Sequence, residues 1–288
     1  MVEYIGVDIG GTNIRVGYID ENDEMHLVHK ESTLENVVTS EDLYNKIQRL
    51  IKSVPNYKEA KAIGIGVPGA IKNLKEIMTS RNVPLLLKFP LAEKLENDLG
   101  KKVYIENDAK VATLAEAIKG AGKDSNIVCY ATVSTGLGGG VAIDKHIYYG
   151  ANGVGGYFSR MILDGKNMSE YVISGTALVT KAYERGLKNI SSASELFESK
   201  DKIAMDIINE FKVNLVNLLL NISITINPHI VVLGGGVMKS KDCFLEDVKN
   251  MFKEKAHSFV KEMKIEVAQV SEPGVLGAAL LAKDMDKE

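Results

Sequence analysis

A glycine-rich turn near the start of the chain constrains the fold more than any other feature. Residues 6–15 (GVDIGGTNIR) connect two β-like runs, at residues 4–7 and 14–19. The pattern therefore predicts a β-hairpin with a tight glycine turn, and not a strand-to-helix turn. Backbone N–H groups at such a turn point outward together and form a nest for an anion. Asp8 beside this nest is typical of a phosphate site that holds a hydrated divalent cation.

A second hairpin of the same kind occurs about half a chain later. A strand-like run at residues 128–133 enters the turn at residues 134–140 (STGLGGG), and residues 141–144 form the returning strand. A dinucleotide-binding fingerprint would need a helix after these glycines, and a β-like run follows instead. Two copies suggest a duplicated domain pair that holds an anion between the turns. One copy alone would leave open an ordinary hairpin, with Asp8 and Thr12 bonding their own turn.

Length and composition allow a two-domain globular protein and exclude several kinds of partner. The 288 residues are 45% hydrophobic and 25% charged, with a net charge of −3, so neither nucleic acid nor an anionic membrane is expected. The two cysteines form no metal-binding or redox spacing. A strand that begins so early leaves no room for a signal peptide. We therefore expect a cytoplasmic protein that binds no nucleic acid and no membrane.

Alternating strand and helix patterns predict an α/β fold. The N-terminal domain is expected at residues 1–110, with the first phosphate hairpin and the sugar-binding loops. The C-terminal domain is expected at residues 111–288, with the second hairpin and the adenosine site, and the small-residue face of the last helix leaves its return to the first domain open. Helices are predicted at residues 40–54, 91–99, 109–119, 170–185, 193–200, 204–226 and 244–260 and from Pro273 onward, and further strands at 62–67, 103–105, 230–233 and 265–270.

These motifs resemble, in order, those of the ROK family of sugar kinases and repressors, within the sugar-kinase, actin and heat-shock-chaperone ATPase superfamily. The resemblance implies two ribonuclease-H-like domains, whose mixed sheets are flanked by helices, with a nucleotide and sugar cleft between them. It also implies ATP- and Mg²⁺-dependent transfer of the γ-phosphoryl group to a sugar hydroxyl, and a homodimer or higher homo-oligomer. The matching segments are VDIGGTNIRVG, GIGVPGAI, TSRNVP, ENDAKVATLAEA, STGLGGGVAID, GANGVGG, SGTAL, IVVLGGGV and GVLGAALLA.

The resemblance also assigns residues. Asp108 matches the general base, and a carboxylate is needed there because a sugar hydroxyl does not ionise at neutral pH. Taken alone, Asp108 equally suits a helix N-cap, Asn82 a turn and Glu170 the first turn of a helix. The expected substrate-binding residues are Gly69, Asn82, Asn107, Tyr157, Arg160 and Glu170; the expected nucleotide-binding residues are Gly10, Gly11, Thr12, Asn13, Arg15, Thr135, Gly136, Gly234, Gly235 and Gly236; and Asp8 is expected to hold Mg²⁺ through water.

The chain departs from the family pattern after the GANG loop. Tyr157 stands where the family has a glutamate, Arg160 stands where it has a histidine, and the zinc-binding cysteines are absent, so no structural zinc is expected there. A guanidinium favours a bidentate carboxylate partner. The expected substrate is therefore a sugar acid such as 2-keto-3-deoxygluconate. The alternatives are a hexokinase or glucokinase, an N-acyl-amino-sugar kinase, or an Arg160 that merely pairs with Glu170 or Asp164.

Three rival classes fit less well. A repressor of the family would carry a DNA-binding helix-turn-helix before the first hairpin, where we expect no room for one. A non-catalytic sugar sensor is disfavoured by the retained Asp108 and the intact phosphate turns. A chaperone ATPase would need a further substrate-binding domain, which 288 residues do not hold.

Overall fold

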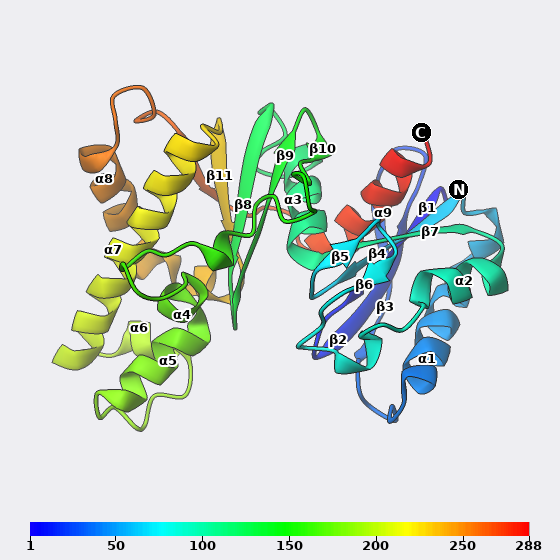
Figure 1. The fold of residues 1–288 in the computed structure, drawn as a ribbon, viewed down its shortest axis with the longest axis horizontal. Coiled ribbons are helices and arrows are strands. Elements are labelled where there is room, and N and C mark those ends of the chain that lie inside the picture. The colour runs from blue at the N-terminus through cyan, green and yellow to red at the C-terminus, as the bar shows by residue number, and fades with distance from the viewer. Residues whose placement is uncertain (288) are drawn as a thin grey trace. The chain divides into compact units, whose positions relative to one another are not determined.

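The computed structural model describes residues 1–287, which form two compact α/β units (Figure 1). Unit 1 contains Met1–Gly120, Lys145–Gly155 and the chain from Val270 onward, and unit 2 contains Ala121–Asp144 and Gly156–Gln269. The chain therefore passes between the units four times. Both sheets are mixed and flanked by helices, so the predicted α/β class is confirmed.

Unit 1 is built on a sheet whose strands follow the order β3-β2-β1-β4-β7. The first three strands along the chain form an antiparallel meander, and β4 and β7 add to β1 in parallel. β4 is buried along its whole length because strands cover both of its edges and helices its faces. The strands are β1 (Tyr4–Ile9), β2 (Asn13–Ile19), β3 (Met25–Ser32), β4 (Ala62–Val67) and β7 (Lys102–Asn107).

Four α-helices pack in unit 1. The first begins at Ser40, as predicted, after a capping box in which Thr39 and Asp42 bond each other's backbone. The helices are α1 (Ser40–Lys52), α2 (Leu91–Leu99), α3 (Asp108–Ile118) and α9 (Pro273–Met285); the short strands are β5 (Ile71–Lys72), β6 (Glu76–Ile77) and β10 (His146–Ile147); and Tyr57–Glu59 and Pro84–Leu86 form 3₁₀ turns.

The last helix, α9, lies directly on the sheet of unit 1 (Figure 1, red) because glycines remove the intervening side chains. A β-carbon at Gly64 would lie 1.8 Å from the carbonyl oxygen of Ala278. A β-carbon at Gly277 would lie 1.8 Å from the carbonyl oxygen of Val111, on α3. This packing explains why all of α3 belongs to unit 1, whereas the boundary expected after residue 110 falls inside that helix.

Unit 2 repeats the same strand pattern in the order β9-β8-β11-β12, with an antiparallel hairpin followed by parallel strands. Its core contains the rings of Phe197, Phe211 and Phe244, which pack with centroids 5.1 to 5.5 Å apart. The elements are β8 (Ile127–Val133), β9 (Leu137–Ile143), β11 (Ile230–Gly234), β12 (Lys264–Val267), α4 (Glu170–Ile173), α5 (Gly175–Glu184), α6 (Ala193–Glu198), α7 (Lys202–Thr225) and α8 (Leu245–Lys255), with 3₁₀ turns at Phe158–Arg160 and Gly236–Cys243.

The elements differ from the sequence predictions in a few places. The helix predicted at residues 170–185 is two helices, because Ser174 leaves helical geometry and its side chain caps α5 at the N–H of Ala177. The edge strand β3 was not predicted, since its residues are largely polar and partly exposed. Within residues 1–287, no helix is both long enough and apolar enough to cross a membrane.

Candidate active site

The carboxylate of Asp8 lies next to the end of β1 and is enclosed by polar groups of unit 1. Its Oδ2 accepts a hydrogen bond from Arg15 Nη1 at 3.1 Å. Arg15 Nε in turn lies 3.1 Å from Glu272 Oε2, just before α9. A β-carbon at Gly274 would lie 2.6 Å from Asp8 Cγ, so the first turn of α9 abuts the carboxylate. Burial, and then repulsion from Asp108, raises the pKa of Asp8 to about 6, although Arg15 opposes the shift.

The first glycine turn is held by bonds from within unit 1. The Gly10 N–H donates to the carbonyl oxygen of Asn13 at 2.9 Å. The buried Thr33 donates its hydroxyl to the Gly10 carbonyl at 2.6 Å and its N–H to the Thr12 carbonyl at 2.9 Å. The Gly10 amide is thus used inside the hairpin. A phosphate at this turn must therefore be bound by amides that follow it, beginning with Gly11.

Asp108 opens helix α3 at the carboxyl end of β7. The N-cap is Asn107 and not Asp108, because Asn107 Oδ1 accepts the N–H groups of Ala109 (3.0 Å) and Lys110 (3.3 Å). The alternative of Asp108 as the cap is therefore wrong. Burial raises the pKa of Asp108, and the hydrogen bond from the Ala109 N–H to its Oδ1 at 2.8 Å opposes that rise.

Two of the predicted sugar-binding loops meet the same end of the sheet. Asn107 Nδ2 donates to the carbonyl oxygen of Gly69 at 2.9 Å. Gly69 has φ +155°, and a β-carbon there would lie 1.7 Å from the Thr79 carbonyl oxygen, so only glycine fits this bend. The backbone of Asn82 packs against the first glycine turn, 3.2 Å from where a β-carbon of Gly11 would stand. Unit 1 thus gathers the predicted base, the predicted cation residue and three of the six predicted sugar-binding residues at one edge, whereas Tyr157, Arg160 and Glu170 belong to unit 2.

The second glycine turn is bonded to α5 within unit 2. The Gly175 N–H donates to the Ser134 carbonyl at 2.7 Å, and the Thr176 N–H donates to the Thr135 carbonyl at 3.3 Å. A β-carbon at Gly136 would lie 2.8 Å from Glu170 Oε1. Glu170, predicted to bind sugar, therefore lies against the turn that is predicted to bind nucleotide.

The third glycine turn follows β11, the neighbour of β8 in the sheet of unit 2. A β-carbon at Gly234 would lie 2.2 Å from Tyr130 Oη, and one at Gly235 would lie 2.3 Å from the Val133 carbonyl oxygen. Gly235 also has φ +90°, which favours glycine. A β-carbon at Gly236 would lie 3.6 Å from Ser134 Oγ, so the second and third glycine turns are adjacent.

Arg160, which was predicted to bind a substrate carboxylate, is the exposed last residue of the 3₁₀ turn at Phe158–Arg160. Its Nη1 lies 3.3 Å from Met168 Sδ. Among residues 1–287 it forms no ion pair with Asp164 or Glu170. Hydrogen bonds, chiefly from the backbone N–H of Asn167, lower the pKa of Asp164 to about 2. The Asp164 carboxylate therefore stabilises the turn in which it lies.

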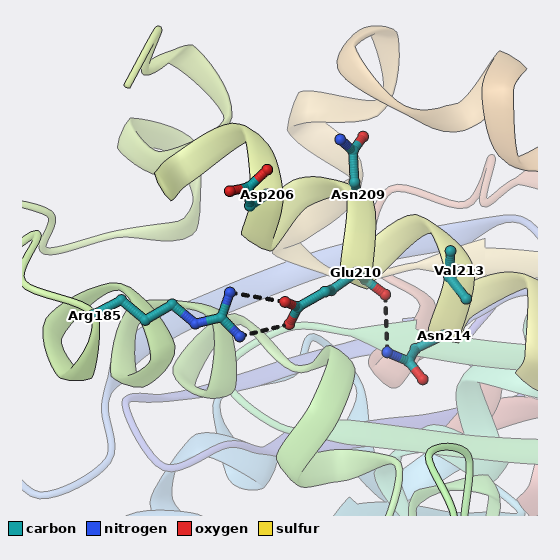
Figure 2. Close-up of a pocket in the computed structure, with 6 residues that line it drawn as sticks. All are labelled: Arg185, Asp206, Asn209, Glu210, Val213 and Asn214. Atoms are coloured by element: carbon teal, nitrogen blue, oxygen red, sulfur yellow. Dashed lines mark hydrogen bonds and ion pairs between the residues drawn. The ribbon is translucent and has the colours of Figure 1, made fainter. Parts of the chain in front are cut away.

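A surface pocket in unit 2 lies apart from all of these residues. Figure 2 shows Arg185, at the end of α5, facing Glu210 on α7 through a bidentate ion pair with contacts of 2.7 and 2.9 Å. Asn214 Nδ2 donates to the Glu210 carbonyl at 2.8 Å. Such a partly exposed pair contributes little free energy, and no predicted site residue lines the pocket.

Sequence reasoning missed three supporting residues of unit 1. Thr33 stands in a polar segment that gave no strand signal, and Glu272 and Gly274 lie at the other end of the chain from the groups they contact. The usable signal was the Glu-Pro-Gly sequence at 272–274, which opens a helix with a proline in its first turn.

Comparison with known proteins places the chain in a family. The ROK family model matches residues 4–285. The chain is 28% identical to a glucokinase of Thermotoga maritima over 98% of each sequence, and 28% identical to an N-acetyl-D-glucosamine kinase of Vibrio cholerae over 96% of this chain and 99% of the relative. A ROK-family glucokinase from Streptomyces griseus, solved with glucose and AMPPNP, matches at TM-score 0.80 and 26% identity, over 99% of this chain and 100% of that one. The protein therefore belongs to the ROK family.

Proposed function

We propose that this protein is an ATP-dependent kinase that phosphorylates a hydroxyl of a neutral sugar, either a hexose or an N-acyl amino sugar. The observation that carries the proposal is the position of Asp108. It opens α3 directly after the last residue of β7, beside the Asn107 cap and within electrostatic range of Asp8. The names of the similar proteins, glucokinase and N-acetyl-D-glucosamine kinase, support the same reaction class.

Asp108 is the group suited to accept the proton of the attacking hydroxyl. Burial raises its pKa, which makes its carboxylate a stronger base than that of an exposed aspartate. The Ala109 N–H bonded to Oδ1 fixes the carboxyl orientation and leaves Oδ2 for the sugar hydroxyl. The proton moves to that oxygen as the sugar oxygen bonds to the γ-phosphorus of ATP and the bond from that phosphorus to the β,γ-bridging oxygen breaks, which releases ADP.

Asp8 and Asp108 together suit a hydrated divalent cation. Each carboxylate is desolvated, and the repulsion from Asp108 contributes to the raised pKa of Asp8. A cation near the two side chains would therefore stabilise the charged form of both carboxylates. Within the described residues no cluster of three or more metal-binding side chains occurs, which fits Mg²⁺ held chiefly by water and phosphate oxygens. When bound, Mg²⁺ would neutralise charge on the transferred phosphoryl group.

We assign the glycine turns to the nucleotide. The amides of Gly11 and Thr12 would bind phosphate oxygens, and Arg15, already paired with Asp8, would compensate their charge. In unit 2 the adjacent turns at residues 134–136 and 234–236 would bind the remaining phosphates and the nucleoside. Asn13 would act through its backbone, because its carbonyl closes the first turn.

The sugar-acid substrate expected from Arg160 is not supported. The relatives named above are kinases of glucose and N-acetylglucosamine. Arg160 is exposed and contacts Met168. The neutral-sugar alternative therefore replaces it, with Asn82, Asn107 and the Gly69 loop proposed to bind the sugar in unit 1 and Tyr157 and Glu170 proposed to bind it in unit 2.

A substrate survey tests the proposal. Phosphate transfer from ATP should be measured with glucose, mannose, N-acetylglucosamine, N-acetylmannosamine and 2-keto-3-deoxygluconate, with and without Mg²⁺. We expect Mg²⁺-dependent turnover with at least one neutral sugar, and a kcat/KM for it well above that for the sugar acid. Preference for the sugar acid, or no turnover on any sugar, would contradict the proposal.

A further inference from the structure

Lys110 is a lysine whose side chain has no solvent exposure. It lies on α3, two residues after Asp108, and its Nζ donates to the carbonyl oxygen of Gly153 at 2.5 Å. The same Nζ is 3.6 Å from Glu106 Oε1 and 5.3 Å from the centroid of the Tyr149 ring. A buried ammonium is unfavourable unless it is paired and hydrogen-bonded, so these contacts account for its presence.

The carboxylate partner of Lys110 also supports the proposed catalytic edge. Glu106 is 2% exposed, and its Oε1 accepts the backbone N–H of Asn107 at 2.6 Å. Asn107 caps α3 and holds the carbonyl of Gly69. Lys110 therefore joins the strand end that leads to Asp108, through its ion pair with Glu106, to the segment that contains Gly153, through its hydrogen bond to that carbonyl.

The segment that Lys110 contacts is a closed loop of unit 1. The Gly155 N–H donates to the Tyr149 carbonyl at 2.9 Å, which closes the loop at residues 149–155. Gly150 and Gly153 have φ +69° and +73°, and residues 149–155 contain neither helix nor strand. Lys110 contacts the loop at both Tyr149 and Gly153, and immediately after Gly155 the chain leaves unit 1.

We propose that Lys110 is a positioning residue, which holds the loop at 149–155 at the carboxyl end of β7, where the acceptor sugar meets Asn107 and Asp108. This inference rests on the proposed kinase function. Lys110 acts through the Gly153 carbonyl and not on the reacting atoms. Its loss should loosen the loop and weaken the binding of the sugar, while the phosphate-binding turns keep their own hydrogen bonds.

The test compares three variants of the full chain. Lys110→Met removes the donor and keeps the volume, but leaves Glu106 without its cation. Glu106→Gln/Lys110→Met also removes the carboxylate charge, yet does not restore a donor to Gly153. Lys119→Met, at the exposed C-terminal end of the same helix, is the control for the loss of one positive charge.

Two measurements separate positioning from a structural role. In Lys110→Met we expect amide hydrogen exchange of residues 149–155 to become about tenfold faster, and KM for the accepted sugar to rise about tenfold, as for one lost hydrogen bond to a charged group. KM for ATP should stay within about twofold of that of the wild type. The double variant should regain thermal stability and keep the raised sugar KM, and Lys119→Met should match the wild type.

Several results would overturn the inference. They are wild-type exchange in the loop of Lys110→Met, an equal rise in both KM values, or a double variant in which the sugar KM returns to normal. The last result would mean that Lys110 only neutralises Glu106. If Lys110→Met does not fold, the double variant decides by the same two measurements. A wild-type protein that phosphorylates no sugar would overturn the proposed function, and exchange in the loop would then decide whether Lys110 anchors it.

Discussion

Arg15 faces Asp8 directly across the first hairpin, with Nη1 3.1 Å from Oδ2. The two residues are register partners of β2 and β1, so the tight turn between them fixes the pair. Glu272 holds the other side of the guanidinium, with its Oε2 3.1 Å from Arg15 Nε. The ionised form of Asp8 is nevertheless disfavoured in the folded protein, since its pKa lies above that of an ordinary aspartate.

Asp8→Asn should therefore make the protein more stable at neutral pH in the absence of Mg²⁺. The pKa of Asp8 is raised from 3.8 to about 6, so between these values the folded state binds more protons than the unfolded state. The free energy of unfolding of the wild type consequently falls as pH rises through this window. Above pH 6 the free energy of unfolding of the variant should exceed that of the wild type by at most about 3 kcal/mol, and the difference should disappear below pH 4.

Urea unfolding across this pH range, in magnesium-free buffer, measures the difference. A variant less stable than the wild type at pH 7 would show that the Arg15 pair outweighs burial. Asp23→Asn is a suitable control, since that carboxylate pairs with Lys283 away from the proposed site.

Asp108→Asn should abolish base catalysis while the fold is retained. We expect kcat to fall by about 10²- to 10⁴-fold, the range for loss of a general base, with sugar binding little changed. In the wild type, kcat/KM should decrease as acid protonates Asp108, and its raised pKa moves that decrease to a higher pH than for an exposed aspartate. The variant should lose this pH dependence.

Steady-state kinetics over a pH series, with sugar binding measured by calorimetry, test this prediction. Because Asn107 caps α3, the substitution should leave the helix start intact. Turnover near that of the wild type would mean that Asp108 is not the base.

The sequence was most informative where function depends on backbone geometry. Glycine turns between β-like runs predicted both hairpins, and these turns lie at equivalent positions in the two sheets. The register of the first hairpin also follows from its turn length, so the pairing of Asp8 with Arg15 was accessible. These features are local, and the geometry of a turn depends mainly on the residues next to one another in the sequence.

Long-range contacts and side-chain exposure were not accessible. Glu272 reaches Arg15 from the other end of the chain. Lys110 falls within the helix predicted at residues 109–119, and only the packed structure shows that its side chain is buried. The sugar-acid interpretation rested on one guanidinium at a motif position, and it is not supported by the similar proteins, which are named as kinases of glucose and N-acetylglucosamine.

Arg160→Ala should have little effect on the preferred sugar. Its side chain is exposed and contacts Met168 Sδ, so its removal leaves no buried group unpaired. We expect kcat/KM for a neutral sugar within about threefold of the wild-type value, below the effect of one lost charge-assisted bond. Kinetics on glucose and 2-keto-3-deoxygluconate, compared with Lys166→Ala in the adjacent exposed loop, provide the measurement. If Arg160→Ala lowered kcat/KM more than tenfold for the sugar acid and not for glucose, Arg160 would be assigned to carboxylate binding again.

Two glycine-to-alanine changes in α9 should separate stability from activity. In a helix such a change ordinarily stabilises by up to about 1 kcal/mol. At Gly277 the new β-carbon would lie 1.8 Å from the Val111 backbone oxygen, which cannot move without separating α9 from α3. We therefore expect Gly277→Ala to destabilise the protein by about 1–3 kcal/mol or more, as overpacking does.

At Gly274 the new β-carbon would instead lie 2.6 Å from Asp8 Cγ, the end of a side chain that is able to rotate away. Gly274→Ala should therefore cost little stability, but displacing the Asp8 carboxylate should raise the Mg²⁺ concentration needed for half-maximal activity and lower kcat. Urea unfolding and Mg²⁺ titration of both variants make the comparison. Equal stability losses at the two positions, or a Gly274→Ala enzyme with wild-type Mg²⁺ dependence, would contradict the placement of Asp8 against the first turn of α9, because that contact is what distinguishes the two glycines.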